Sequence, residues 1–144
     1  MPLVEESIEI TMDPMELFPI VSDFEKYPEI MDAVKQVTIL ERGDGYSVSE
    51  WINEAAGRVI KWTEKDYIKP AENRIDFELI KGDLKTYNGF WHLASNGSAT
   101  KVVVSINFEF GVPMLAPLLH PLLAKLLREN LRQMLEALKK RAEG

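Results

Sequence analysis

The chain has 144 residues, of which 46% are hydrophobic and 28% are charged, a composition that excludes a disordered or fibrous protein and predicts one globular domain over 1–144. It lacks cysteine, which excludes disulfides and thiolate chemistry and fits a reducing compartment. With 23 acidic against 17 basic residues and a net charge of −6, the chain should repel a phosphate backbone, so we expect no nucleic-acid partner.

The N-terminal segment predicts a strand followed by two short helices. In "VEESIEITM", residues 4–12, apolar and polar side chains alternate with the period of a half-buried strand. Asp13 can cap a helix that begins at Pro14, and Pro28 divides the following segment into short helical turns. No basic segment followed by an apolar one precedes the strand, and no run in the chain reaches about 18 apolar residues, so we expect a cytoplasmic protein with no integral membrane segment.

Residues 34–110 predict six further strands, because short turn signals such as "RGDGY" and "SNGS" separate segments of strand-like pattern. Links this short favour antiparallel neighbours, and Asn96-Gly97 is the strongest hairpin signal among them. The expected strands are 34 to 42, 46 to 54, 58 to 69, 73 to 81, 84 to 95 and 99 to 110.

Alternation also predicts which side chains of these strands face the core. The parity of 46–54 is ambiguous: Val48 and Ile52 share one face with Glu50, whereas Trp51 shares the other with Ser49. In the remaining strands the expected inward residues are Ile60, Trp62, Ile75, Phe77, Leu79, Tyr87, Gly89, Trp91, Leu93, Val102, Val104, Ile106, Phe108 and Phe110.

The C-terminal segment predicts a long amphipathic helix that begins near Pro121, after an irregular or short helical approach containing Pro113 and Pro117. Apolar residues recur every three or four positions over 123–138, which gives one stripe that packs on a sheet. Upstream leucines widen this arc beyond what one sheet face needs, so something else must cover them. These leucines are Leu115, Leu118, Leu119 and Leu122.

Three segments resemble one known family. They are "VSDFEKYPEIMDAVKQVTILER" (21–42), "GDLKTYNGFWHL" (82–93) and "FEFGVPMLAPLL" (108–119), and the similarity spans essentially the whole chain. It is to the START-like, Bet v 1-like (SRPBCC) superfamily, in its polyketide cyclase/dehydrase and coenzyme Q-binding branch. The resemblance implies an α+β helix-grip fold. In that fold a curved seven-stranded antiparallel sheet wraps around a long C-terminal helix, with two short helices between the first two strands.

The resemblance also implies an elongated apolar cavity between the helix and the sheet. The leucines of 115–127 would then form the cavity wall and entrance, or they would pack against the two short helices. The tryptophans offer flat walls for a ligand, but most tryptophans in small domains belong to the core. Asn130 interrupts the apolar stripe and could bind a ligand or a backbone group. The candidate ligand-binding residues are Trp51, Trp62, Phe77, Tyr87, Trp91, Phe108, Leu119, Leu123, Leu127 and Asn130.

Signals for catalysis are weak. Glu50, if it points inward, would be a carboxyl group in an apolar pocket and a candidate acid or base; the alternative is a solvated strand carboxylate. Arg58 could meet an anionic or carbonyl oxygen, or form a salt bridge at the rim. The chain has two histidines and no metal-binding, nucleotide-binding or GxSxG motif, so we expect no metal and no cofactor.

Two functions from different classes follow from the resemblance. The first is a noncatalytic carrier or chaperone that binds an apolar small molecule, such as a quinone, isoprenoid, lipid or polyketide-like compound, in the cavity. The second is an aromatase/cyclase that positions a poly-ketone and promotes its cyclisation by acid/base catalysis. A third follows from relatives described as ribosome-associated growth inhibitors, against which the net charge argues. Nothing in the sequence predicts an oligomeric state.

Overall fold

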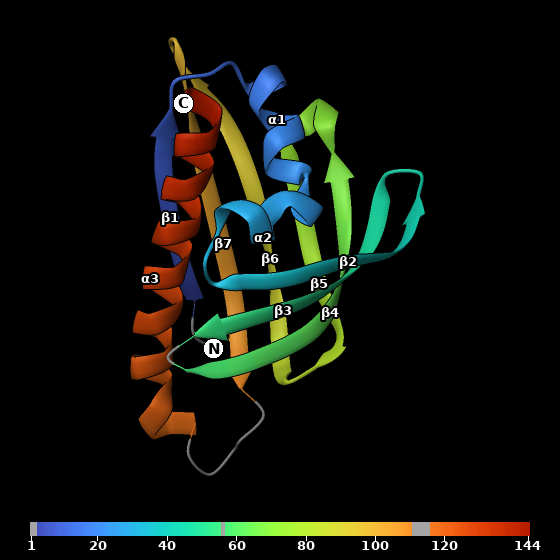
Figure 1. Ribbon diagram of the computed structural model, residues 1–144, viewed down its shortest axis with the longest axis vertical. Coiled ribbons are helices and arrows are strands. Elements are labelled where there is room, and N and C mark those ends of the chain that lie inside the picture. The colour runs from blue at the N-terminus through green and yellow to red at the C-terminus, as the bar shows by residue number, and fades with distance from the viewer. Residues whose placement is uncertain (1–2, 56, 111–115) are drawn as a thin grey trace.

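A computed structural model of the chain describes residues 3–55, 57–110 and 116–144 (Figure 1), with the side chains of 55, 58, 110 and 116–123 outside the description. Seven strands and a long C-terminal helix form the domain, with short helices between the first two strands. In chain order the elements are β1 (Leu3–Ile10), α1 (Pro14–Ser22), η1 (Phe24–Lys26), α2 (Tyr27–Ile30), β2 (Val34–Gly43), β3 (Tyr46–Ala55), β4 (Arg58–Lys69), η2 (Pro70–Glu72), β5 (Arg74–Gly82), β6 (Leu84–Asn96), β7 (Ala99–Phe110) and α3 (Ala116–Glu143).

The strands form one antiparallel sheet in the order β1-β7-β6-β5-β4-β3-β2. Each strand from β2 to β7 pairs with the next one along the chain, as the short links predicted, and β1 joins the far edge beside β7. The sheet curves strongly, so that β2, β3 and β4 bend around the same space that α3 borders (Figure 1). The predicted helix-grip fold is therefore confirmed, and each predicted strand of 34–110 is within one residue of the observed one.

The long helix α3 lies along β1 and β7, at one side of the curved sheet (Figure 1). Leu131, Leu135 and Leu138 on its inner stripe are buried. Polar contacts fix its outer flank to β1: Arg132 pairs with Glu6, and Lys139 Nζ donates to the carbonyl oxygen of Glu9 at 2.8 Å. This attachment leaves β3, β4 and β5 facing the helix from across the interior.

The prediction that the main helix starts near Pro121 is wrong, because α3 is already helical at Ala116. Pro117 is the second residue of the helix, where the backbone N–H has no helical partner in any case, so proline costs little there. Pro121 removes a single hydrogen bond from a helix of 28 residues, and the helix continues through it.

The short helices close one end of the space between α3 and the sheet (Figure 1). Asp13 caps α1 as predicted, since its side chain accepts a hydrogen bond from the N–H of Met15 at 2.8 Å. Leu17 and Val21 of α1 and Phe24 of η1 are fully or almost fully buried. The link between β1 and β2 is thus part of the core.

Burial settles which faces of the strands point inward, toward α3. The predicted inward residues of β5, β6 and β7 are buried or packed against the core wherever their side chains are described, apart from Gly89, which has none. In β3, where the sequence was ambiguous, Ser47, Ser49 and Trp51 are the buried set. Glu50 therefore lies on the outer face, where its carboxylate is 3.9 Å from the ammonium group of Lys61.

Candidate functional site

A continuous row of aromatic rings follows the inner face of the sheet. Tyr27 of α2 meets Trp51 of β3 with ring centroids 5.7 Å apart. Trp51 stacks on Trp62 of β4, with centroids 5.9 Å apart and ring planes within 4° of parallel. Tyr87 of β6 continues the row, with its centroid 5.0 Å from that of Trp62 and 5.3 Å from that of Phe77. The row gives the interior a flat, polarisable wall suited to aromatic or unsaturated molecules.

A polar centre lies beside this wall, formed by Ser47, Ser49, Glu64 and Asp66. The antiparallel register sets Ser49 opposite Glu64 and Ser47 opposite Asp66, so β3 and β4 present all four side chains on the same face. The hydroxyl of Ser49 donates to Asp66 Oδ2 at 2.6 Å, and that of Ser47 does so at 3.4 Å.

The aromatic row and the polar centre are hydrogen-bonded to each other. The indole N–H of Trp62 donates to Glu64 Oε1 at 2.8 Å, and the indole N–H of Trp51 donates to Ser49 Oγ at 2.8 Å. Each tryptophan therefore turns its polar edge toward the carboxyl groups. This fixes the orientation of both rings and both acids together.

The two carboxyl groups are buried, with 4% of Glu64 and 0% of Asp66 exposed. Burial raises the pKa of Glu64 well above its ordinary value, and the charge of Asp66 and a hydrogen bond between the two groups raise it further. Burial also raises the pKa of Asp66, although hydrogen bonds from Glu64, Ser49 and Ser47 oppose that rise. Glu64 is consequently the group that holds a proton when Asp66 is ionised.

One oxygen of this centre, Asp66 Oδ1, is buried and has no hydrogen-bond partner among the described residues. A buried acceptor without a donor is costly, at about 1 to 3 kcal/mol. A proton on Glu64, lying between the two carboxyl groups, supplies a donor to Asp66. The hydrogen bond between the two carboxyl groups and the raised pKa of Glu64 indicate that the pair shares a proton, while Oδ1 itself remains without a partner among the described residues.

Two tyrosines border the same centre. The pKa values of Tyr27 and Tyr87 are raised well above the ordinary value, first by burial and then by the negative charges of Glu64 and Asp66. The hydroxyl of Tyr27 donates to the carbonyl oxygen of Val21. Tyr87 keeps part of its surface exposed, although protein surrounds its hydroxyl group deeply enough to raise the pKa. Both phenols are neutral donors near the acids.

The structure places most of the predicted ligand-binding residues on this interior. Trp51, Trp62, Phe77, Trp91 and Phe108 are buried on the inner face of the sheet. Tyr87 joins them and is partly exposed.

Of the four candidates on α3, only Leu127 and Asn130 have side chains that the structure describes. Leu127 packs against the core and keeps some exposure, and Asn130 is also partly exposed. The side chains of Leu119 and Leu123 lie outside the described residues, as do Leu115 and the side chains of Leu118 and Leu122.

Of the two predicted catalytic candidates, the structure places only Glu50, and it lies outside the polar centre. The inward placement considered for Glu50 is wrong, because the neighbouring Ser49 and Trp51 occupy the inner face of β3. Arg58 begins β4, and its side chain lies outside the described residues.

Sequence reasoning missed Glu64 and Asp66, although the signal was present. Both have the parity of Ile60 and Trp62, which were predicted to face inward on the same strand. Acidic residues are seldom fully buried without a partner, and this general tendency concealed them.

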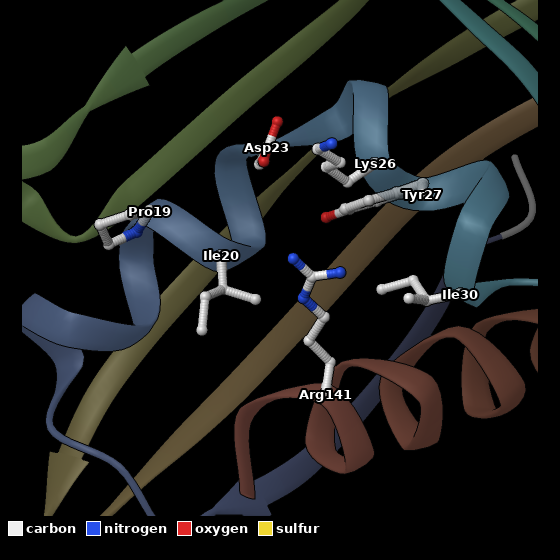
Figure 2. Close-up of a pocket in the computed structure, with 7 residues that line it drawn as sticks. All are labelled: Pro19, Ile20, Asp23, Lys26, Tyr27, Ile30 and Arg141. Carbon is white, nitrogen blue, oxygen red and sulfur yellow. The ribbon is translucent and has the colours of Figure 1, made fainter. Parts of the chain in front are cut away.

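A hollow lies on the surface between α1, α2 and the C-terminal end of α3 (Figure 2). Its volume is about 200 Å³, and it is bordered by two cationic side chains, Lys26 and Arg141, and one acidic side chain, Asp23. The guanidinium group of Arg141 reaches from α3 toward Ile20 and Tyr27 (Figure 2). The lining residues are Pro19, Ile20, Asp23, Lys26, Tyr27, Ile30 and Arg141.

Metal-binding and membrane-spanning features can be assessed over the described residues. There, no three His, Cys, Asp or Glu side chains are grouped so that they could hold a metal ion. Within the same part of the chain, no helix is both long enough and apolar enough to cross a membrane.

The curved sheet, the gripping helix and the aromatic interior define the class of protein. The chain belongs to the polyketide cyclase/dehydrase and lipid transport family, whose sequence pattern matches residues 10–135. Among curated proteins it is similar to the ribosome association toxin RatA of Vibrio cholerae. The two are 26% identical over 113 residues, which are 78% of each chain.

Solved structures show the same fold. TTHA0849 from Thermus thermophilus superposes with a TM-score of 0.94 at 26% identity, covering 99% of this chain and 97% of that one. A START superfamily protein from Mycobacterium smegmatis gives 0.85 at 28% identity, with coverage of 98% and 97%. The Zhui aromatase/cyclase from a Streptomyces species gives 0.89 at 21% identity, with coverage of 99% and 93%, and this likeness concerns the fold alone.

Proposed function

We propose that this protein binds an apolar small molecule between α3 and the inner face of the sheet, as a noncatalytic carrier or chaperone. The ligand class is a quinone, isoprenoid, lipid or polyketide-like compound. One observation carries the proposal: inward-facing apolar side chains at one end of the sheet keep accessible surface. Ile60, Leu79 and Tyr87 are of this kind, and Leu127 of α3 is another.

The contrast with neighbouring positions gives this observation its weight. Ile75 and Phe77, on the same face of β5 as Leu79, are 0% and 5% exposed. The core is therefore closely packed at one end of the strand and less so at the other. Tyr87 is enclosed by protein yet accessible in part, as expected of a side chain that borders a hollow.

Burial energetics favour a guest at this place. A ligand that covered about 100 Å² of the accessible apolar surface would gain roughly 2.5 kcal/mol, at about 25 cal/mol per Å². The aromatic row adds flat contacts for a ring, and the family description names lipid transport. These features support a binding role without any chemical step.

Filling the proposed space should block binding. We expect Leu79→Trp to weaken uptake of menadione, a naphthoquinone, by at least about tenfold, because the indole occupies the volume in which the ligand would bury a comparable apolar surface. Equilibrium dialysis of the full chain, with the quinone measured by absorbance, tests this.

Ile80→Trp is the matched control, since Ile80 is the next residue, is 51% exposed and points to the outer face. It should bind menadione like the wild type. Equal affinities of the two variants would show that the ligand, if bound, lies elsewhere.

A second candidate function is that of an aromatase/cyclase, and the Glu64–Asp66 pair favours it. A protonated and an ionised carboxyl group side by side can donate and accept protons in turn, as acid/base catalysis of enolisation and dehydration requires. Solved aromatase/cyclases share the fold at 14–22% identity. Cyclisation of a model poly-ketone separates the two functions, because a carrier leaves the product distribution of the uncatalysed reaction unchanged.

Ribosome association, named for the Vibrio cholerae relative, has less support in this chain. The net charge is −6, and contact with ribosomal RNA requires clustered basic side chains. The identity of 26% does not carry the role across by itself.

A further inference from the structure

The Glu64–Asp66 pair holds two acids with no cationic partner among the described residues. Among the described residues, neither acid forms a salt bridge, and the side chains facing the pair are hydroxyl, indole or apolar groups. Each packed element contributes to this environment: Ser47 and Ser49 from β3, Trp62 from β4 itself, Leu79 and Phe77 from β5, Tyr87 from β6 and Tyr27 from α2. A buried carboxyl pair in such surroundings cannot carry two charges cheaply.

The buried pair has partly exposed neighbours on one side. Leu79 lies directly opposite Glu64 in the β4–β5 register, on the same face, and is partly exposed. Tyr87, whose hydroxyl is close enough for the two acids to raise its pKa, is partly exposed as well. A guest seated against these two residues would therefore lie beside the acids.

We infer that the Glu64–Asp66 pair is the recognition point for a hydroxyl group on the ligand, so that the preferred guest is a neutral phenol or enol and not a pure hydrocarbon. The inference rests on the proposed function, and it names the chemical class of ligand for that site. The ligand O–H would donate to Asp66 Oδ1, a buried oxygen that has no hydrogen-bond partner among the described residues.

The charge state of the pair selects this class over others. An anionic ligand would meet the negative charge of Asp66, beside which the described part of the chain places no cation. An ammonium group would have to leave water for a site where Ser47, Ser49 and Glu64 already stabilise that charge. A neutral hydroxyl loses little hydration and satisfies a buried acceptor.

The test compares two ligands that differ only by the hydroxyl group, 1-naphthol and naphthalene, bound to the full chain near pH 6. The wild type should bind 1-naphthol at least about tenfold more tightly, as expected of a hydrogen bond to a charged group. Asp66→Asn should remove most of that preference while keeping affinity for naphthalene. Glu50→Gln, an acid removed from the outer face of β3, should change neither.

A ligand-free measurement tests the shared proton separately. Because the pKa of Glu64 is higher in the folded chain than in the unfolded chain, the folded state binds more protons between those two values. The contribution of Glu64 to folding stability is then fully present below its unfolded pKa of about 4.3. It is lost as pH rises from there toward the folded pKa, by up to about tenfold in the folding equilibrium per pH unit. Glu64→Gln should flatten this dependence, and urea unfolding at a series of pH values measures it.

The outcomes separate the inference from the proposed function. Equal affinity for both ligands in the wild type overturns the hydroxyl inference and leaves apolar binding intact. A preference that survives in folded Asp66→Asn overturns it as well. No binding of either ligand contradicts the proposed function, and the inference with it. A wild-type stability that does not fall with pH relative to Glu64→Gln contradicts the shared proton.

Discussion

Gly89→Ala should cost about 3 kcal/mol or more of folding free energy, at or beyond the upper end of ordinary overpacking effects. Gly89 lies on β6 between Phe77 of β5 and Ile106 of β7. A Cβ atom there would be 1.9 Å from the carbonyl oxygen of Ser105 and 2.9 Å from its carbonyl carbon. These are backbone atoms of the paired strand, so the clash can be relieved only by separating β6 from β7.

Gly97→Ala is the matched control for this prediction. Gly97 lies in the β6–β7 turn with φ of 67°, and an added Cβ atom meets nothing within 4 Å. Only the left-handed backbone conformation then opposes alanine, at a cost of about 1 kcal/mol. Urea unfolding followed by circular dichroism measures both variants. If Gly89→Ala were no more destabilising than Gly97→Ala, the close approach of β6 and β7 would be wrong.

Tyr27→Ala should destabilise the fold by about 3 to 5 kcal/mol, the range for removing a large aromatic side chain from a core. Tyr27 is fully buried, and its ring contacts Phe24, Trp51 and Trp91 at centroid distances of 5.4, 5.7 and 6.3 Å. It joins the short helices to the sheet and begins the aromatic row. Its loss would leave a cavity where that row meets α2.

Tyr27→Phe separates the packing of the ring from its hydrogen bond. This variant keeps the ring contacts and removes only the donor to the carbonyl oxygen of Val21. The expected loss is about 1 to 3 kcal/mol, the cost of an unsatisfied buried acceptor. Thermal unfolding measures the stability of both variants. If Tyr27→Phe and Tyr27→Ala were equally unstable, the assigned packing role of the ring would be wrong.

Much of the fold was predictable because the local signals agree with one another. The turn sequences between 34 and 110 bound each strand to within one residue, and Asn96-Gly97 forms the expected hairpin. The start of α3 was not predictable by the same rule, because the proline penalty depends on position within a helix. Pro117 lies where no helical hydrogen bond is lost.

The site was predictable only in part. Alternation placed Trp62, Phe77 and Tyr87 correctly on the inner face, because apolar side chains there follow a strict period of two. The same period continues to Glu64 and Asp66, but the sequence gives no indication that serines on the next strand will pair with them. That pairing depends on the β3–β4 register, which exists only in the folded sheet.

The buried acids have a cost in folding stability. Two carboxyl groups in an apolar interior cost stability that well-packed apolar residues of similar size would not. Their cost is reduced by the hydroxyls of Ser47 and Ser49, the indole of Trp62 and the shared proton. We therefore expect this polar centre to contact the ligand, as the inference about its hydroxyl group requires.

The indole N–H signals of the three tryptophans provide the most direct test of the central claim, that a guest binds on the inner face of the sheet. In a ¹⁵N correlation spectrum these protons report on the interior, since those of Trp51 and Trp62 are bound to Ser49 and Glu64. Titration with menadione should shift the Trp62 signal strongly and saturably. If all three indole signals stayed unchanged while backbone signals moved around Arg141 and Ile20, the guest would occupy the surface hollow, and binding on the inner face of the sheet would be contradicted.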